Sequence, residues 1–243
     1  MPLLNNHSFF IAVLNVEISE CFFEQNEIFK LAPLKANPIG PNQVRVLLWH
    51  HTFDTQALIQ IAQKLAPNIL NLNEYSNFCN KRIIEKLSTR ILLSRLLVEN
   101  YFQLDYHTTG RPYLLHSPYY ISISHTQNTF AVSISFNRHG IDIEQWSEKP
   151  HNIASMFINS QDYIPSDALT IDITRNYTTL WSTKEAVYKL VDIPGLSLKH
   201  DITAQTFKNG FAQINNHKLQ STCKIDYSFH PHFVLTIAHS LES

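Results

Sequence analysis

The segment from Tyr119 to Glu144 most constrains the fold of this chain, because its apolar residues recur at every second position. Tyr119 to Ile123 and Phe130 to Ser135 alternate apolar with small polar residues, as strands with one buried face do. The short polar stretch 126–129 between them is typical of a hairpin turn, and a second turn leads to Ile141–Glu144. The spacing predicts an antiparallel three-stranded meander.

Helical patterns are expected on both sides of this segment. Apolar residues recur at helical spacing from Leu58 to Leu65, behind a capping residue at Thr52 or Asp54, and again over 80–102 and 180–190. The remaining strands are expected at Phe9–Val16, Val44–Trp49, Phe211–Ile214 and Phe233–Ala238. Helices beside antiparallel strands indicate an α+β protein.

Composition excludes several classes of partner. A chain of 243 residues with 44% apolar residues can bury a sizeable core, as one large domain or two small lobes. A net charge of −1 argues against bulk attraction to nucleic acid or to an anionic membrane, so phosphate binding must rest on local clusters. Cys21, Cys79 and Cys223 suggest neither a disulfide framework nor a zinc site. With no bilayer-length apolar run, a soluble cytoplasmic protein is expected.

Two carboxylates stand on one face of the strand that contains Gly140-Ile141-Asp142-Ile143-Glu144. Ile141 and Ile143 face the core, while Asp142 and Glu144 face the other way, about 6–7 Å apart along the strand. One ion can bridge two carboxylates so placed. The alternative is an edge strand with a hydrated acidic face.

A second acidic signal follows on the helix that contains Trp181-Ser182-Thr183-Lys184-Glu185-Ala186-Val187-Tyr188-Lys189. Trp181, Glu185 and Lys189 recur every four residues and share one helix face. By itself this predicts a surface ion pair between Glu185 and Lys189. If Glu185 instead faces Asp142 and Glu144, three carboxylates converge, and their hard oxygen ligands select Mg²⁺ or Mn²⁺.

His125 closes the first strand of the meander, after Ser124. Alternation places its ring on the side of Ile121 and Ile123, so a partly buried structural histidine is the plain interpretation. Ser124 raises the alternative of a serine nucleophile, but the Gly-x-Ser-x-Gly elbow is absent from Ile-Ser-Ile-Ser-His.

Two groups of basic residues are candidates for binding an anion. Arg82, Lys86 and Arg90 follow one another at intervals of four, which stacks three cations along one side of a helix. They form either a solvated face or a site for an anion. Gly110-Arg111-Pro112 is either a simple turn or a platform that meets an adenine or a phosphate.

Taken in order, these segments resemble the 4'-phosphopantetheinyl transferases of the large, surfactin-synthetase type. The resemblance covers roughly residues 80 to 200. The matching motifs are Gly-Arg-Pro at 110–112, Ile-Ser-Ile-Ser-His at 121–125, Gly-Ile-Asp-Ile-Glu at 140–144, Trp-Ser-Thr-Lys-Glu-Ala-Val-Tyr-Lys at 181–189 and Gly-Leu-Ser-Leu at 195–198.

The resemblance implies an enzyme that moves the phosphopantetheine arm of coenzyme A onto a serine of an apo acyl or peptidyl carrier protein, releasing adenosine 3',5'-bisphosphate. It implies a monomer of two similar lobes related by pseudo-twofold symmetry, each a small antiparallel sheet packed with helices. The lobes would span 1–136 and 137–243, with coenzyme A between them and the metal and catalytic residues in the second.

The resemblance also implies roles for individual residues. Asp142, Glu144 and Glu185 match the Mg²⁺ ligands, and Glu185 also matches the proposed general base. The residues that match coenzyme A contacts are Ser124, His125, Lys184, Lys189, Arg111, Pro112 and, for the 3'-phosphate, one of Arg82, Lys86 and Arg90. Of these, Lys184 and Lys189 would neutralise the pyrophosphate and His125 would hydrogen-bond a phosphate, so both lysines and the histidine count with Glu185 as catalytic.

One departure from the family pattern concerns the partner. The family often has Glu where 156–163 carries Asp162, in a segment beside the carrier-protein surface. Two other functions remain open: a paralogue that binds carrier proteins without catalysis, and another Mg²⁺-dependent phosphodiester or nucleotide enzyme.

Overall fold

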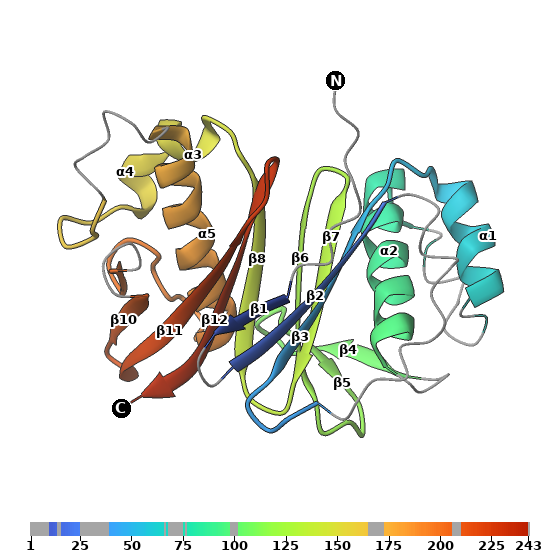
Figure 1. The fold of residues 1–243 in the computed structure, drawn as a ribbon, viewed down its shortest axis with the longest axis horizontal. Coiled ribbons are helices and arrows are strands. Elements are labelled where there is room, and N and C mark those ends of the chain that lie inside the picture. The colour runs from blue at the N-terminus through green and yellow to red at the C-terminus, as the bar shows by residue number, and fades with distance from the viewer. Residues whose placement is uncertain are drawn as a thin grey trace.

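The computed structural model describes residues 10–13, 16–24, 39–65, 67, 75, 77–97, 102–164, 173–205 and 210–242, with the backbone alone for 10–24. The chain is an α+β protein, as the sequence predicts, and each of its two large sheets has five strands (Figure 1). None of the described helices is both long and apolar enough to cross a lipid bilayer.

The first sheet has the strand order β1-β2-β3-β7-β6 and is antiparallel except between β2 and β3. Its strands are β1 (Phe10–Val13), β2 (Val16–Glu24), β3 (Val44–His50), β6 (Tyr120–Thr126) and β7 (Thr129–Ser135). The second sheet has the order β8-β12-β11-β10-β9 and is antiparallel throughout the described pairings. Its strands are β8 (His139–Gln145), β9 (Ile202–Ala204), β10 (Phe211–Asn216), β11 (Leu219–Phe229) and β12 (Phe233–Glu242).

Five helices and a small hairpin complete the described part of the chain. The helices are α1 (Thr55–Leu65), α2 (Asn80–Leu96), α3 (Lys149–Asn152), α4 (Ala154–Phe157) and α5 (Ile173–Val191), and the hairpin is β4 (Leu104–Tyr106) with β5 (Pro112–Leu114). Asp54 is the cap of α1, since its Oδ1 accepts a hydrogen bond from the Ala57 amide at 2.8 Å. The helix expected over 80–102 ends earlier, because Leu97 is already extended.

The molecule has four layers, which are α1 with α2, the first sheet, the second sheet and α5 (Figure 1). The helices cover the outer faces of the sheets, and the inner faces of the two sheets pack against each other. Strand β3 is buried on both faces: Leu47 and Trp49 pack on α1 and α2, while Val44, Val46 and Leu48 pack on β8 and β12. This explains the uninterrupted apolar run from Val46 to Trp49.

The expected three-stranded meander is wrong in its third strand. The β6–β7 hairpin forms as predicted, but β8 leaves the first sheet and pairs with β12 of the second. The other edge of β7 is already occupied by β3. On the free edge of β8, the amides of Ile141 and Ile143 donate to the hydroxyls of Ser122 and Ser124, at 3.0 and 3.2 Å. Serine side chains thus join the two sheets.

The sequence pattern does not predict three of the strands, which are β2, the short β9 and the long β11. The strand expected at Phe9–Val16 is present only as β1 over Phe10–Val13, because Val16 already begins the antiparallel β2; Phe9, Leu14 and Asn15 lie outside the described residues. The chain passes from the first sheet to the second between Ser135 and His139.

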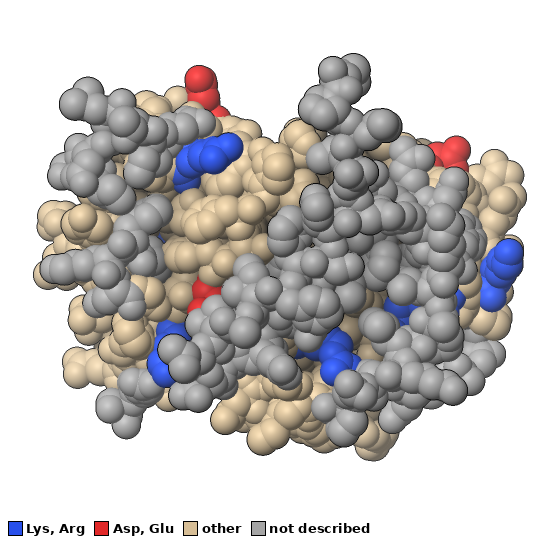
Figure 2. All heavy atoms as spheres, viewed as in Figure 1, with Lys and Arg blue, Asp and Glu red and all other residues tan. Residues whose placement is uncertain are grey.

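Charged side chains are dispersed on the face of the molecule in Figure 2. The described Lys and Arg side chains lie there as separate spots, with no continuous basic area among them. This agrees with the net charge of −1 and leaves anion binding to local clusters.

Gly140 sets the distance between α5 and β8, which yields a stability prediction. A Cβ at this position would lie 2.1 Å from the Ala186 carbonyl oxygen and 2.6 Å from the Leu190 amide nitrogen. We expect Gly140→Ala to push the helix away and to lower the free energy of unfolding by about 1–3 kcal/mol or more. Urea denaturation measures this. Gly40→Ala is the matched control, because its new methyl group would meet only the flexible Gln43 side chain, and an equal loss in both variants would contradict the prediction.

Candidate functional site

Asp142 lies where β8, β6 and α5 meet. Its Oδ1 accepts hydrogen bonds from Lys189 Nζ at 2.7 Å and from Ser124 Oγ at 2.9 Å. Lys189 Nζ also donates to Ser124 Oγ and to the Ile141 carbonyl, each at 3.0 Å. The Asp142 side chain is 5% exposed, whereas that of Lys189 is 27% exposed. The ion pair is therefore closed on the carboxylate side and open to solvent on the lysine side.

Glu144 and Glu185 belong to the same electrostatic neighbourhood. Burial raises the pKa of Glu144 to about 7, and the negative charge of Asp142 contributes to this rise, although a hydrogen bond from Trp181 Nε1 at 3.0 Å opposes it. Burial also raises the pKa of Glu185; Asp142 raises it further and Lys189 lowers it. The two acidic segments therefore fold together, and the charge of Asp142 acts on both Glu144 and Glu185.

The acidic cluster of Asp142, Glu144 and Glu185 fits a hard cation in charge and in donor type. Asp142 Oδ2 is buried and accepts no hydrogen bond from any residue that the structure describes. A free carboxylate oxygen beside further carboxylates is the donor set of Mg²⁺ or Mn²⁺. Among the described residues, however, no three His, Cys, Asp or Glu side chains are close enough to hold a metal ion as they stand. The acidic cluster therefore suits a hard cation by its charge and donor atoms, but its described side chains are not yet arranged around one.

His125 lies on the opposite face of β6 from Ser124, toward α2, as alternation predicts. Its ring is 6.1 Å from that of Phe130, and its Nε2 is 3.8 Å from Glu85 Oε2. Arg82 Nη1 pairs with the same carboxylate oxygen at 3.0 Å. Burial lowers the pKa of His125, the charge of Glu85 raises it, and that of Lys189 lowers it. His125 and Arg82 therefore form a second cluster around Glu85, within reach of the charge of Lys189.

Three of the basic residues of α2, Arg82, Lys86 and Arg90, have different environments despite their regular spacing. The Arg82 side chain is 50% exposed. Lys86 Nζ lies over the rings of Phe78 and Tyr106, at 5.0 and 5.6 Å from their centroids. Arg90 is 8% exposed, with its guanidinium 5.5 Å from the centroid of Tyr75. Of the three, Arg82 is the one most open to a ligand.

Lys184 does not join the acidic cluster, which corrects the expectation that it faces the pyrophosphate. Its side chain is fully buried and its Nζ pairs with Asp162 Oδ2 at 2.6 Å. It also donates to the carbonyls of Phe157, Ile202 and Leu198, at 2.7, 2.8 and 3.0 Å. These bonds tie α5 to α4, the 159–162 turn and β9, so Lys184 holds the second sheet's helices together.

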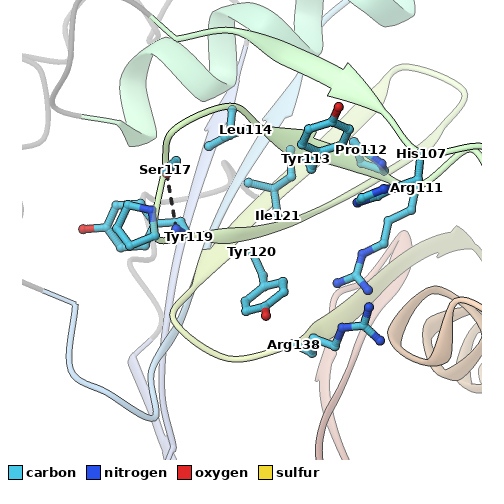
Figure 3. Close-up of a pocket in the computed structure, with 11 residues that line it drawn as sticks. His107, Arg111, Pro112, Tyr113, Leu114, Ser117, Tyr119, Tyr120, Ile121 and Arg138 are labelled. Carbon is cyan, nitrogen blue, oxygen red and sulfur yellow. Dashed lines mark hydrogen bonds between the residues drawn. The ribbon is translucent and has the colours of Figure 1, made fainter.

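Arg111 and Pro112 line a pocket of about 250 Å³ below the β4–β5 hairpin (Figure 3). The guanidinium of Arg111 lies 5.6 Å from the ring centroid of Tyr120, and its Nη1 is 3.9 Å from Asp192 Oδ2. Arg138 enters the pocket from the turn before β8. The turn expected at 110–112 is present, with Gly110 at a φ of 87°.

No protein-family model matches this chain, and no curated protein matches it either.

Several residues of the site were not assigned these roles by the sequence. Trp181 was placed on the helix face of Glu185, and its indole holds Glu144. Glu85 has no predicted role, yet its carboxylate joins Arg82 to His125. Asp162, the departure from the family pattern, pairs with Lys184. Lysine is almost never fully buried without a partner, so a lysine on an inward side of the helix would have indicated a carboxylate nearby.

The Lys184–Asp162 pair predicts a stability effect that an active-site lysine would lack. Lys184→Met leaves a buried carboxylate without its partner, which costs about 3–5 kcal/mol of unfolding free energy. The double variant Lys184→Met/Asp162→Asn removes both charges, and we expect it to be more stable than the single variant. Chemical denaturation of the three proteins checks the order. A single variant as stable as the parent would contradict the structural role.

Proposed function

We propose that this protein transfers the 4'-phosphopantetheine group of coenzyme A to a serine of an apo acyl or peptidyl carrier protein, with release of adenosine 3',5'-bisphosphate. One observation carries the proposal. Asp142 of β8 meets Lys189 of α5, while Glu144 and Glu185 are close enough for its charge to raise their pKa values. Phosphoryl transfer depends on such positioning and charge stabilisation more than on covalent help from the protein.

In the proposed reaction, each residue acts through a property that its surroundings give it. Lys189 is partly exposed, so its ammonium can neutralise the pyrophosphate oxygens. Glu185 accepts the proton of the carrier serine, because burial and Asp142 raise its pKa and make it a stronger base. The serine oxygen bonds to the β-phosphorus, the bond from that phosphorus to the bridging oxygen breaks, and adenosine 3',5'-bisphosphate leaves with the bonding electrons.

Asp142, Glu144 and Glu185 would hold Mg²⁺, or Mn²⁺ in its place. Such a cation supplies Lewis-acid polarisation of the phosphate oxygens. Before it binds, the protonated and ionised forms of Glu144 are both populated around neutral pH, because its pKa is about 7. The buried Asp142 Oδ2, which has no hydrogen-bond donor among the described residues, is the oxygen with most to gain from a cation.

The proposal includes a two-lobe arrangement, with lobes at 1–136 and 137–243 related by pseudo-twofold symmetry and coenzyme A between them in a monomer. What supports it is that each half contributes one five-stranded sheet with a helix on its outer face. Ser124, His125 and Arg82 come from the first half and the acidic cluster from the second, so a ligand between the lobes would contact both.

Substitution of the proposed base tests the function directly. With coenzyme A, Mg²⁺ and several apo carrier proteins, the parent should add the phosphopantetheine mass to a carrier, as measured by intact-protein mass spectrometry. We expect Glu185→Gln to lower the rate by about a hundredfold or more, because a base and a charge are lost. The exposed Glu148 provides the matched control, Glu148→Gln, which should keep the parent rate.

The products of the same assay separate the other functions. Carrier binding without a mass increase would indicate an inactive paralogue, and breakdown of coenzyme A without a carrier would indicate a different phosphodiester enzyme. Near-normal transfer by Glu185→Gln, with its fold intact by circular dichroism, would reject the role of that residue.

Cation binding has a readout apart from activity. A cation that binds only the folded chain raises its thermal stability in proportion to the logarithm of its concentration. We expect Mg²⁺ to raise the melting temperature of the parent at constant ionic strength, and Asp142→Asn to remove the response. Ca²⁺ and NaCl serve as comparison salts. An equal rise in Asp142→Asn would place the bound cation elsewhere.

A further inference from the structure

Arg111 carries hydrogen-bond donors that no described residue accepts. Its side chain is only 8% exposed, yet Nη1 and Nη2 are buried and have no hydrogen-bond partner among the described residues. The nearest carboxylate oxygen, Asp192 Oδ2, is 3.9 Å from Nη1, which is beyond hydrogen-bond distance. A buried guanidinium in this state costs free energy unless an acceptor reaches it.

A second guanidinium increases this cost. Figure 3 shows Arg138 extending toward Arg111 across the pocket, beside the ring of Tyr120. Burial lowers the pKa of Arg111, and the positive charge of Arg138 lowers it further, while Asp192 raises it. Two arginines thus converge against one carboxylate, and the pocket keeps excess positive charge.

Aromatic and aliphatic side chains line the pocket beside its polar groups. Tyr113, Tyr119, Leu114 and Ile121 line it, at the end of β6 away from His125. Its volume of about 250 Å³ is below the roughly 300–1,000 Å³ of typical small-molecule sites. The space suits an anionic group with at most a compact organic substituent.

We infer that this pocket is a binding site for a phosphate group, held between the guanidinium groups of Arg111 and Arg138. A phosphate presents three terminal oxygens, so it can accept paired hydrogen bonds from two guanidinium forks, whereas a carboxylate has two oxygens and satisfies one fork. The resemblance found in the sequence places Arg111 near the adenine of coenzyme A and assigns no role to Arg138, so a phosphate held by both guanidinium groups goes beyond it. The tests below contain neither coenzyme A nor a carrier protein, so their outcome is separate from that of the proposed transfer.

Binding of small probes tests the site. Isothermal titration calorimetry with inorganic phosphate, phenyl phosphate, benzoate and phenol should give binding of both phosphates, weaker binding of benzoate and none of phenol. Tighter binding of phenyl phosphate than of phosphate would identify an organic phosphate as the ligand, and equal binding would identify phosphate alone. Either result supports the site. Absence of phosphate binding, or equal binding of benzoate, would overturn it.

Substitution of Arg138 distinguishes the pocket from general attraction of anions. Arg138 is exposed, so Arg138→Ala should fold, and we expect it to weaken phosphate binding at least tenfold through loss of charge-assisted hydrogen bonds. Lys218→Ala removes one positive charge from the exposed turn before β11 and should keep the parent affinity. Equal weakening in both variants would overturn the inference.

Thermal unfolding gives a second readout that a purely structural arginine would not produce. Without anion, Arg138→Ala should melt no lower than the parent, because it relieves repulsion between like charges. Phosphate should raise the melting temperature of the parent and leave that of Arg138→Ala unchanged. Arg111→Gln should behave as Arg138→Ala does in the titration. A phosphate-induced rise that survives in Arg138→Ala would contradict the inference.

Discussion

The close approach of α5 to β8 is the contact on which the acidic cluster depends. Gly140 has no side chain, so the helix backbone lies directly on the strand. Two residues further along β8, Asp142 then meets Lys189, and two further again, Glu144 meets the indole of Trp181.

The serine hydroxyls of β6 also position the acidic cluster, because they join the two sheets without backbone hydrogen bonds between β6 and β8. Ser122 and Ser124 accept the amide hydrogens on the free edge of β8. Ser124 also donates to Asp142, so one hydroxyl contributes both to the contact between the sheets and to the acidic cluster. Satisfying a sheet edge in this way avoids an unpaired backbone donor in the interior. Ser124, one of the two residues that join the sheets, is therefore also one that orients Asp142.

Sequence periodicity predicted which faces of the strands are buried but not which strands are neighbours. Ile141 and Ile143 face the core as expected, because alternation depends on the strand alone. The pairing of β8 with β12 depends on residues about ninety positions away, which no local pattern reports. The regular spacing of Arg82, Lys86 and Arg90 likewise predicted a shared side of α2. Their different environments come from residues outside that helix, such as Phe78 and Tyr106 over Lys86.

Lys184 and Lys189 have different partners because of their positions on the helix, which can be read from the sequence. At about 100° per residue, Lys189 lies roughly 40° from Glu185 around the helix axis and roughly 140° from Lys184. A face that presents Glu185 and Lys189 to β8 must therefore turn Lys184 toward Asp162, on another side of α5. One lysine then stands against the three carboxylates of the acidic cluster. A proton on Glu144, whose pKa is about 7, relieves part of the excess negative charge. The remainder is what a divalent cation at the free oxygen of Asp142 would neutralise.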